Sequence, residues 1–162
     1  MNKQAYYDGL PKKQMAAEAL FFNDKGELLI LHPTYKNRFE IPGGIVKNEE
    51  APKEAVEREI EEEIGLSEKV KQLLVCDYWH PADGRPDNLQ FIFYGGILSE
   101  EQINNIQLEE KEIGSFEFVS VTSEKDKKKL SKRQRVGPRV ILALEALEKK
   151  QNYYLEDARK PN

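Results

Sequence analysis

A chain of 162 residues suits one domain with a single hydrophobic core, and its net charge of −4 argues against a dedicated nucleic-acid or anionic-membrane surface. A lone cysteine excludes an internal disulfide, and no run of about 18 apolar residues could span a bilayer. The first 13 residues lack the apolar core of a signal peptide. We therefore expect a cytoplasmic protein that forms one domain over residues 1–162, with polar ends at about 1–13 and 151–162.

The first half of the chain predicts a hairpin, a glycine loop and a helix. Apolar residues 15–22 and 28–32 flank the turn-forming residues 23–26, and residues 39–41 then lead into the loop Pro42-Gly43-Gly44. Pro52 suits the first turn of the helix and Gly65 suits the position just past its end. The residues predicted to form its buried face are Ala51, Ala55, Val56, Ile60 and Ile64.

The second half predicts three more strands and a closing helix. Residues 72–78 and 89–98 are expected to pair around the loop 80–87, and residues 116–121 form another strand. Cys76 follows an apolar run and is expected to be a buried small hydrophobe. The helix over residues 139–147 starts after Pro138 and places Val140, Leu144 and Leu147 on one face. Mixed strands and helices predict an α/β layered domain.

The helix that starts at Pro52 carries crowded carboxylates in its last turn. Glu63 lies about 40° from Glu59 around the helix, and Glu62 lies about 60° to the other side. These acids repel one another and the negative end of the helix dipole. A hard cation would reverse the penalty, because Mg²⁺ prefers carboxylate oxygens together with waters and substrate phosphates. The alternative is a solvated acidic face, which is common in a chain rich in Glu and Lys.

The spacing around these acids resembles the signature of the Nudix hydrolases. That signature reads Gly, five residues, Glu, seven residues, then Arg-Glu-apolar-any-Glu-Glu-any-Gly-apolar. All of its specified positions match between Gly44 and Leu66, and Pro42-Gly43 before them is also usual for the family. The resemblance implies an α/β/α sandwich with a mixed β-sheet. It also implies an Mg²⁺-dependent pyrophosphohydrolase that cleaves a nucleoside diphosphate linked to a further group, with Mn²⁺ able to substitute for Mg²⁺.

The resemblance also assigns roles within the signature. It implies that Glu59, Glu62 and Glu63 bind the metal together with the backbone carbonyl of Gly44, and that Glu59 is a candidate base. The remaining charged positions of the signature, Arg58 and Glu50, are implied to pair and to orient the catalytic helix.

Other candidates lie outside the signature. Family members often recruit one more acid from a later loop, where Glu110 and Glu112 are both candidates and a charged turn without a role is the alternative. Tyr78 and Trp79 could stack on a nucleobase or merely pack a hairpin end, and Arg38 could meet a phosphate or lie free on the surface.

The substrate is not determined by these residues. Pro81 lies 15 residues after Leu66, near the proline of ADP-ribose-cleaving relatives, but its neighbours do not match that pattern. The basic stretch 125–139 lacks interleaved aromatics, so a solvated loop and helix start explains it at least as well as RNA binding.

Two other functions are open on the same fold. A non-catalytic nucleotide sensor would be expected to lose signature carboxylates, and an isoprenyl diphosphate isomerase would require a catalytic cysteine, for which Cys76 is a poor candidate. We expect a small nucleotide-type substrate and no membrane or nucleic-acid partner. A homodimer is left open, since dimers are common among relatives.

Overall fold

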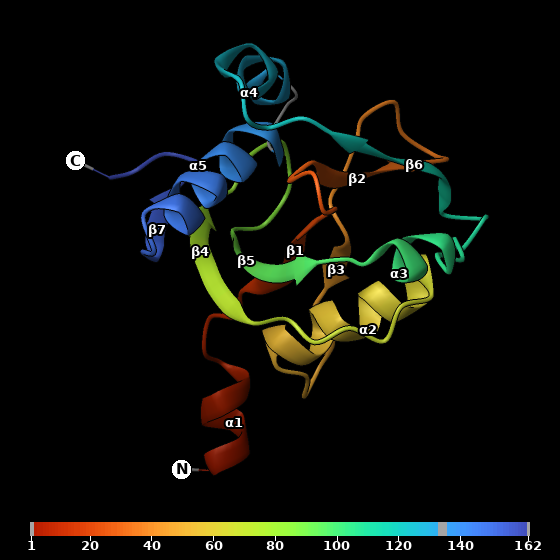
Figure 1. Cartoon of the computed structure of the whole chain (residues 1–162). Helices are drawn as coiled ribbons and strands as arrows, with labels where there is room; N and C mark the ends of the chain where they lie inside the picture. Colours follow the sequence, from red (N-terminus) through yellow and green to blue (C-terminus); the bar gives the residue numbers. More distant parts are fainter. Residues whose placement is uncertain (1, 133–135, 162) are drawn as a thin grey trace.

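The computed structural model describes residues 2–132 and 136–161, which form a mixed seven-stranded sheet between helices (Figure 1). The strand order is β6-β2-β1-β5-β4-β7, and β3 pairs with β1. The strands are β1 (Gln14–Phe22), β2 (Leu28–Pro33), β3 (Gly43–Ile45), β4 (Gln72–Trp79), β5 (Asn88–Ile97), β6 (Ile113–Val119) and β7 (Tyr153–Glu156). The helices are α1 (Lys3–Asp8), α2 (Pro52–Ile64), α3 (Glu100–Asn104), α4 (Glu124–Ser131) and α5 (Val136–Glu148).

The sheet is mixed because β1 runs parallel to β5, and β4 runs parallel to β7, while the other pairs are antiparallel. Both of its faces are covered, so β1 reads as a nearly continuous apolar run. Ala19 and Phe21 pack with α2 on one face, whereas Leu20 and Phe22 pack with α5 on the other. The α/β/α sandwich expected from the sequence is confirmed.

Helix α2 begins and ends where the sequence predicts. The carboxylate of Glu54 accepts a hydrogen bond of 2.9 Å from the backbone N–H of Ala51, and Pro52 occupies the first turn. Gly65 ends the helix with a φ of 69°, a conformation that glycine adopts without strain. Ala51 was wrongly assigned to the buried face, because it caps the helix and is exposed; the additional buried residue is Glu63.

Several boundaries differ from the predictions. The segment expected to be a glycine loop forms β3 at Gly43–Ile45, because its backbone pairs with Ala16 to Glu18 of β1. Strand β6 starts earlier than expected, and α5 begins three residues before Arg139. On α5, Ala143 and Ala146 are fully buried beside Val140, while Leu144 and Leu147 are half-buried at the edge of the interface. Cys76 is also half-buried rather than buried.

The two ends of the chain carry structure that the composition did not predict. Residues 153–156 add β7 to the edge of the sheet beside β4, and Leu155 is fully buried there. At the other end α1 projects from the body, and none of its residues is buried (Figure 1). No helix in the described part of the chain is long and apolar enough to cross a membrane.

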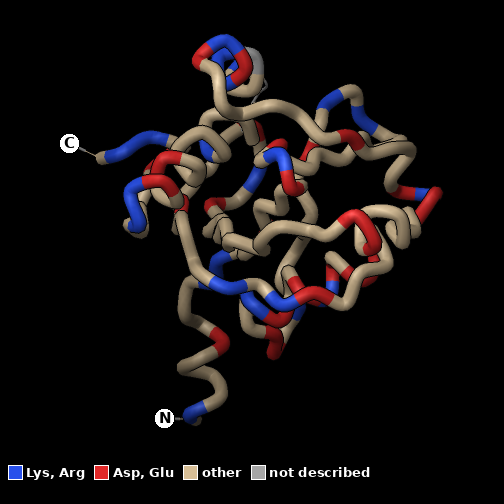
Figure 2. Tube along the Cα trace, in the orientation of Figure 1, with Lys and Arg blue, Asp and Glu red and all other residues tan. Residues whose placement is uncertain are grey.

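The basic stretch 125–139 divides into two parts. Helix α4 lies at the periphery and mixes basic with acidic residues (Figure 2). Arg139 instead belongs to the interior, where only 4% of it is exposed. It therefore cannot contribute to a solvated basic surface. Residues 133–135 lie outside the described part of the chain.

Candidate active site

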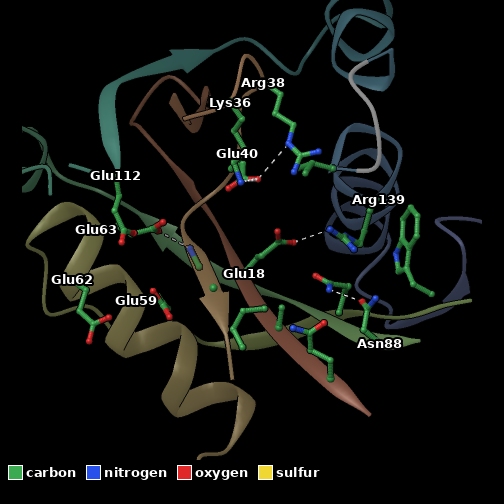
Figure 3. A pocket seen from close by; sticks show the side chains of 18 of the residues that line it. Glu18, Lys36, Arg38, Glu40, Glu59, Glu62, Glu63, Asn88, Glu112 and Arg139 are labelled. Atoms are coloured by element: carbon green, nitrogen blue, oxygen red, sulfur yellow. Dashed lines mark hydrogen bonds and ion pairs between the residues drawn. The ribbon is translucent and has the colours of Figure 1, made fainter. Parts of the chain in front are cut away.

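A cavity of about 580 Å³ opens between α2, β3 and the N-terminal end of α5 (Figure 3). One wall carries the α2 carboxylates Glu59, Glu62 and Glu63. The far end carries Glu18 of β1 and Arg139 of α5. The volume falls within the range of about 300–1,000 Å³ that small-molecule sites occupy.

Arg58 holds the acidic turn of α2 against the strand that precedes it. Its Nε lies 2.7 Å from Glu50 Oε1, and its Nη1 lies 2.7 Å from Glu59 Oε1 and 2.8 Å from Glu62 Oε2. Nη2 also donates to the carbonyl of Ile45 at 3.2 Å. The Arg58 guanidinium and the N–H of Lys47 lower the pKa of Glu50 to about 2. Arg58, paired with Glu50 and bonded to the Ile45 carbonyl, thus joins α2 to β3, the strand that contains Gly43 and Gly44.

Glu63 points inward from α2 toward the glycine strand. Its Oε2 accepts a hydrogen bond of 2.9 Å from the backbone N–H of Gly43. Burial, joined by the nearby charges of Glu59, Glu40 and Glu112, raises the pKa of Glu63 to about 8 against the effect of that hydrogen bond. Glu63 is thus a buried acid next to three other carboxylates.

Gly44 brings the backbone against Glu59. A Cβ atom at position 44 would lie 2.5 Å from the carboxyl carbon of Glu59 and 2.6 Å from its Oε1. Only glycine allows this approach, which places a main-chain segment and a carboxylate side by side.

The donor set fits a hard divalent cation in its chemistry, but the carboxylates are not gathered around one point. Across residues 2–132 and 136–161, no three acidic, His or Cys side chains are close enough to hold an ion together. The carboxylates are held apart by different partners. Arg58 binds Glu59 and Glu62, whereas the backbone N–H of Gly43 binds Glu63. Arg58 engages one oxygen of each carboxylate, Glu59 Oε1 and Glu62 Oε2.

The structure separates the two candidates for an additional acid. Glu112 lines the main cavity and also an adjoining hollow of about 410 Å³ that it shares with Glu59, Glu62 and Glu63. Glu110 lines a different hollow, beside Ile106 and Gly114. Only Glu112 of these two faces the signature carboxylates.

Of the three candidates for substrate contact, two line the main cavity and one does not. Arg38 and Trp79 line the main cavity, and Arg38 Nε lies 3.7 Å from Glu40 Oε1. Tyr78 is engaged elsewhere, since its hydroxyl donates to Asp87 Oδ2 at 2.8 Å and its ring meets His80 edge-on at 4.9 Å. Tyr78 therefore packs the hairpin end, which was the alternative to stacking on a nucleobase.

Sequence reasoning missed the charged residues at the far end of the cavity. Glu18 interrupts the apolar run of β1, and this isolated acid in a buried strand was the available signal. Arg139 sits near the start of α5 and was read as part of a basic surface. Their proximity depends on how β1 and α5 pack, which no local pattern specifies.

An α/β/α sandwich in which a glycine strand and an acidic helix meet at one opening is the arrangement expected of a Nudix protein. The model of the NUDIX domain matches residues 12–140. The chain therefore belongs to the Nudix family.

Two curated relatives match parts of the chain. The ADP-ribose pyrophosphatase of Methanocaldococcus jannaschii is 44% identical over 89 residues, which are 54% of this chain and 53% of that protein. The RNA pyrophosphohydrolase of Ectopseudomonas mendocina is 35% identical over 54 residues, which are 33% of this chain and 34% of that protein. The matches thus span about half or less of either relative.

Solved structures show the same fold at low sequence identity. The MutT protein from Methanosarcina mazei Go1 superposes with a TM-score of 0.65 at 20% identity, covering 89% of this chain and 100% of that one. A UDP-X diphosphatase superposes with a TM-score of 0.67 at 18% identity, covering 96% of this chain and 75% of the other. These likenesses establish the architecture of the chain.

Proposed function

We propose that this protein is an Mg²⁺-dependent pyrophosphohydrolase that cleaves the diphosphate linkage of a nucleoside diphosphate joined to a further group. The observation that carries the proposal is the placement of Glu59, Glu62, Glu63 and Glu112 around one opening beside Gly44. Such crowding of acids is costly unless a cation offsets it. The adjoining cavity is large enough for a nucleotide.

The ligands proposed for the ion are Glu59, Glu62, Glu63 and the carbonyl of Gly44. Magnesium held there would neutralise the diphosphate oxygens and acidify the attacking water. Arg58 bonds to Glu50 and to the Ile45 carbonyl of β3, which would fix the position of α2 relative to β3. The carboxylates and the Gly44 backbone would then stay on the same side of the opening. Arg58 also holds Glu59 and Glu62 until an ion competes for them.

Two carboxylates are placed to take the proton of the water. Glu59 lies against Gly44, and Glu112 faces it across the opening from the segment before β6 (Figure 3). Either one would accept the proton on a carboxylate oxygen as water bonds to one phosphorus and the bridging phosphorus–oxygen bond breaks, which releases the other phosphate as the leaving group. Arg38 and Lys36, on the rim of the same cavity, would offset the charge of the phosphate groups.

The comparisons support a substrate that contains a phosphoanhydride. The relatives include a pyrophosphatase, a pyrophosphohydrolase and a diphosphatase, and their names pair this linkage with ADP-ribose, RNA and UDP derivatives. Among these, the small nucleotide derivatives match a cavity of about 580 Å³, which is a volume typical of small-molecule sites.

The test is product release from a panel of nucleoside triphosphates, ADP-ribose, sugar nucleotides and dinucleoside polyphosphates, with Mg²⁺ and with EDTA. We expect metal-dependent cleavage of at least one member and a loss of at least about 100-fold in kcat for Glu62→Gln. Glu61→Gln is the matched control, because Glu61 is the neighbouring acid on α2, is exposed, and does not line the cavity.

Near wild-type turnover in Glu62→Gln would refute the ligand assignment. Nucleotide binding without cleavage of any panel member would instead identify a non-catalytic sensor.

A further inference from the structure

Two buried charged residues, Glu18 of β1 and Arg139 of α5, line the end of the cavity that lies away from α2 (Figure 3). Asp77 of β4 pairs with Arg139 and completes a buried group of three charges. Arg139 Nη2 lies 3.2 Å from Glu18 Oε2, and its Nη1 lies 3.7 Å from Asp77 Oδ2. Asp77 is fully buried, and the side chains of Arg139 and Glu18 are 5% and 12% exposed. Two acids therefore face one guanidinium with little water.

Asp77 has an evident structural role in this group. Its Oδ2 accepts a hydrogen bond of 2.5 Å from Trp79 Nε1, and its Oδ1 accepts one of 3.1 Å from the backbone N–H of Ala158. Asp77 therefore orients the Trp79 ring and anchors the segment after β7 through hydrogen bonds. Its charge also stabilises the guanidinium of Arg139.

Glu18 has no such set of partners. Among the described residues, its buried Oε2 and the buried Nε of Arg139 have no hydrogen-bond partner. Burial raises the pKa of the Glu18 carboxyl, and the charge of Arg139 opposes that rise. Within the described part of the chain, Glu18 Oε2 is ion-paired with Arg139 Nη2 but accepts no hydrogen bond, and Arg139 Nε donates none. Buried polar atoms nearly always make hydrogen bonds in folded proteins, so these two groups in a cavity wall indicate a ligand that supplies the missing donor and acceptor.

The surroundings suit a flat, uncharged group. Asn88 and Gln90 of β5 line the same end of the cavity, and Gln90 Nε2 donates to Asn88 Oδ1 at 2.6 Å. The Trp79 ring lies there too, with the guanidinium carbon of Arg139 5.8 Å from its centroid. Glu18 and Asp77 outnumber the one guanidinium that they face, so this group of charges disfavours a phosphate. The phosphates of a nucleotide therefore belong near Arg38 and the metal ligands, and its base belongs at this end.

Resting on the proposed function, we propose that this end of the cavity binds the nucleobase of the substrate and selects guanine. The Glu18 carboxylate accepts hydrogen bonds from N1–H and from the 2-amino group, and Arg139 donates to O6. Guanine matches because its edge presents two adjacent N–H donors next to a carbonyl. Adenine presents an acceptor at the corresponding ring nitrogen, and uracil presents one N–H between two carbonyls.

The preference can be measured without turnover. Trp79 is the single tryptophan and lines the cavity, so its fluorescence reports occupancy. We would titrate the protein in EDTA with GMP, IMP, AMP and UMP, which share the same phosphate. IMP differs from GMP only by the missing 2-amino group. We expect GMP to bind at least about tenfold more tightly than the other three, because a site that hydrogen-bonds a group discriminates against the analogue lacking it.

Glu18→Gln should remove the preference by replacing one acceptor with a donor that faces N–H groups. Glu117→Gln is the control, since it makes the same change on β6, outside the cavity. Equal binding of the four nucleotides, a preference for AMP or UMP, or a GMP preference that survives in folded Glu18→Gln would overturn the inference. If that variant does not fold, the wild-type comparison of GMP with IMP still decides. A preference for GMP without metal-dependent cleavage would refute the proposed function alone, while cleavage without base preference would refute the inference alone.

Discussion

Replacing Gly44 with alanine tests whether the contact between backbone and Glu59 governs activity. The added Cβ would lie 2.5 Å from the carboxyl carbon of Glu59, where an ordinary contact needs about 3.5 Å. The carboxylate must therefore move by about 1 Å, and it can do so because it ends a flexible side chain. A displacement of about 1 Å in a catalytic group costs on the order of 100-fold in rate. The stability cost should stay near 1 kcal/mol, the cost of an off-rotamer side chain.

The assay is kcat with Mg²⁺, together with the melting temperature of each variant. Gly114→Ala is the matched control, because a Cβ at that position on β6 meets its nearest neighbours at an ordinary 3.5 Å. Gly43→Ala provides the contrast: its φ is 143° and its Cβ would lie 2.2 Å from the carbonyl oxygen of Ala17, so it should unfold the protein instead. A folded Gly44→Ala with wild-type kcat would refute the role given to this contact.

Three further results are expected. Glu112→Gln should lower kcat by at least about 100-fold while Glu110→Gln leaves it within about twofold, because only Glu112 faces the α2 carboxylates; equal effects in a kinetic assay would contradict that distinction. Saturating Mg²⁺ should raise the melting temperature by several degrees over EDTA, as about 2.7 kcal/mol is gained at 100 times the Kd, and an unchanged melting curve would argue against metal binding. Lys149, Lys160 and Tyr153 lower the folded-state pKa of Glu145 to about 2, so its stabilising effect should be present above pH 4.5 and fade as the pH falls toward 2. Glu145→Gln should accordingly melt about 1–4 °C lower at pH 7, with the gap closing in acid, and a gap that widens in acid would show that the sign is wrong.

The parts of the fold that the sequence predicts are those encoded locally. The limits of α2 follow from Pro52 and Gly65, and the hairpin of β1 and β2 follows from two apolar runs around a turn. The pair of Arg58 and Glu50, which the resemblance to the signature implied, is present and joins α2 to the segment just before it. Such features depend on neighbours within a few residues, so pattern reasoning finds them.

The parts that escaped prediction depend on contacts between distant segments. Glu18 and Arg139 are 121 positions apart in the numbering, and only the packing of α5 on the sheet brings them together. Strand β7 has only four residues and lies within a polar tail, and Leu155 is its one buried residue, so the sequence offers no strand pattern there. Likewise Glu112 and Glu110 are equivalent by composition and separate only when the chain before β6 takes its path.

The hydrogen bond from Ala158 to Asp77 makes the C-terminal segment a structural partner of the ligand cavity. Asp77 orients Trp79 and faces Arg139, so one backbone N–H beyond β7 supports both groups. A change that loosens this edge strand would leave the carboxylates of α2 in place and disturb the opposite end of the cavity. The end of the cavity proposed to bind metal and the end proposed to bind the base therefore rest on separate parts of the chain. If both proposals hold, changes in the C-terminal segment would alter substrate choice and leave the chemistry constant.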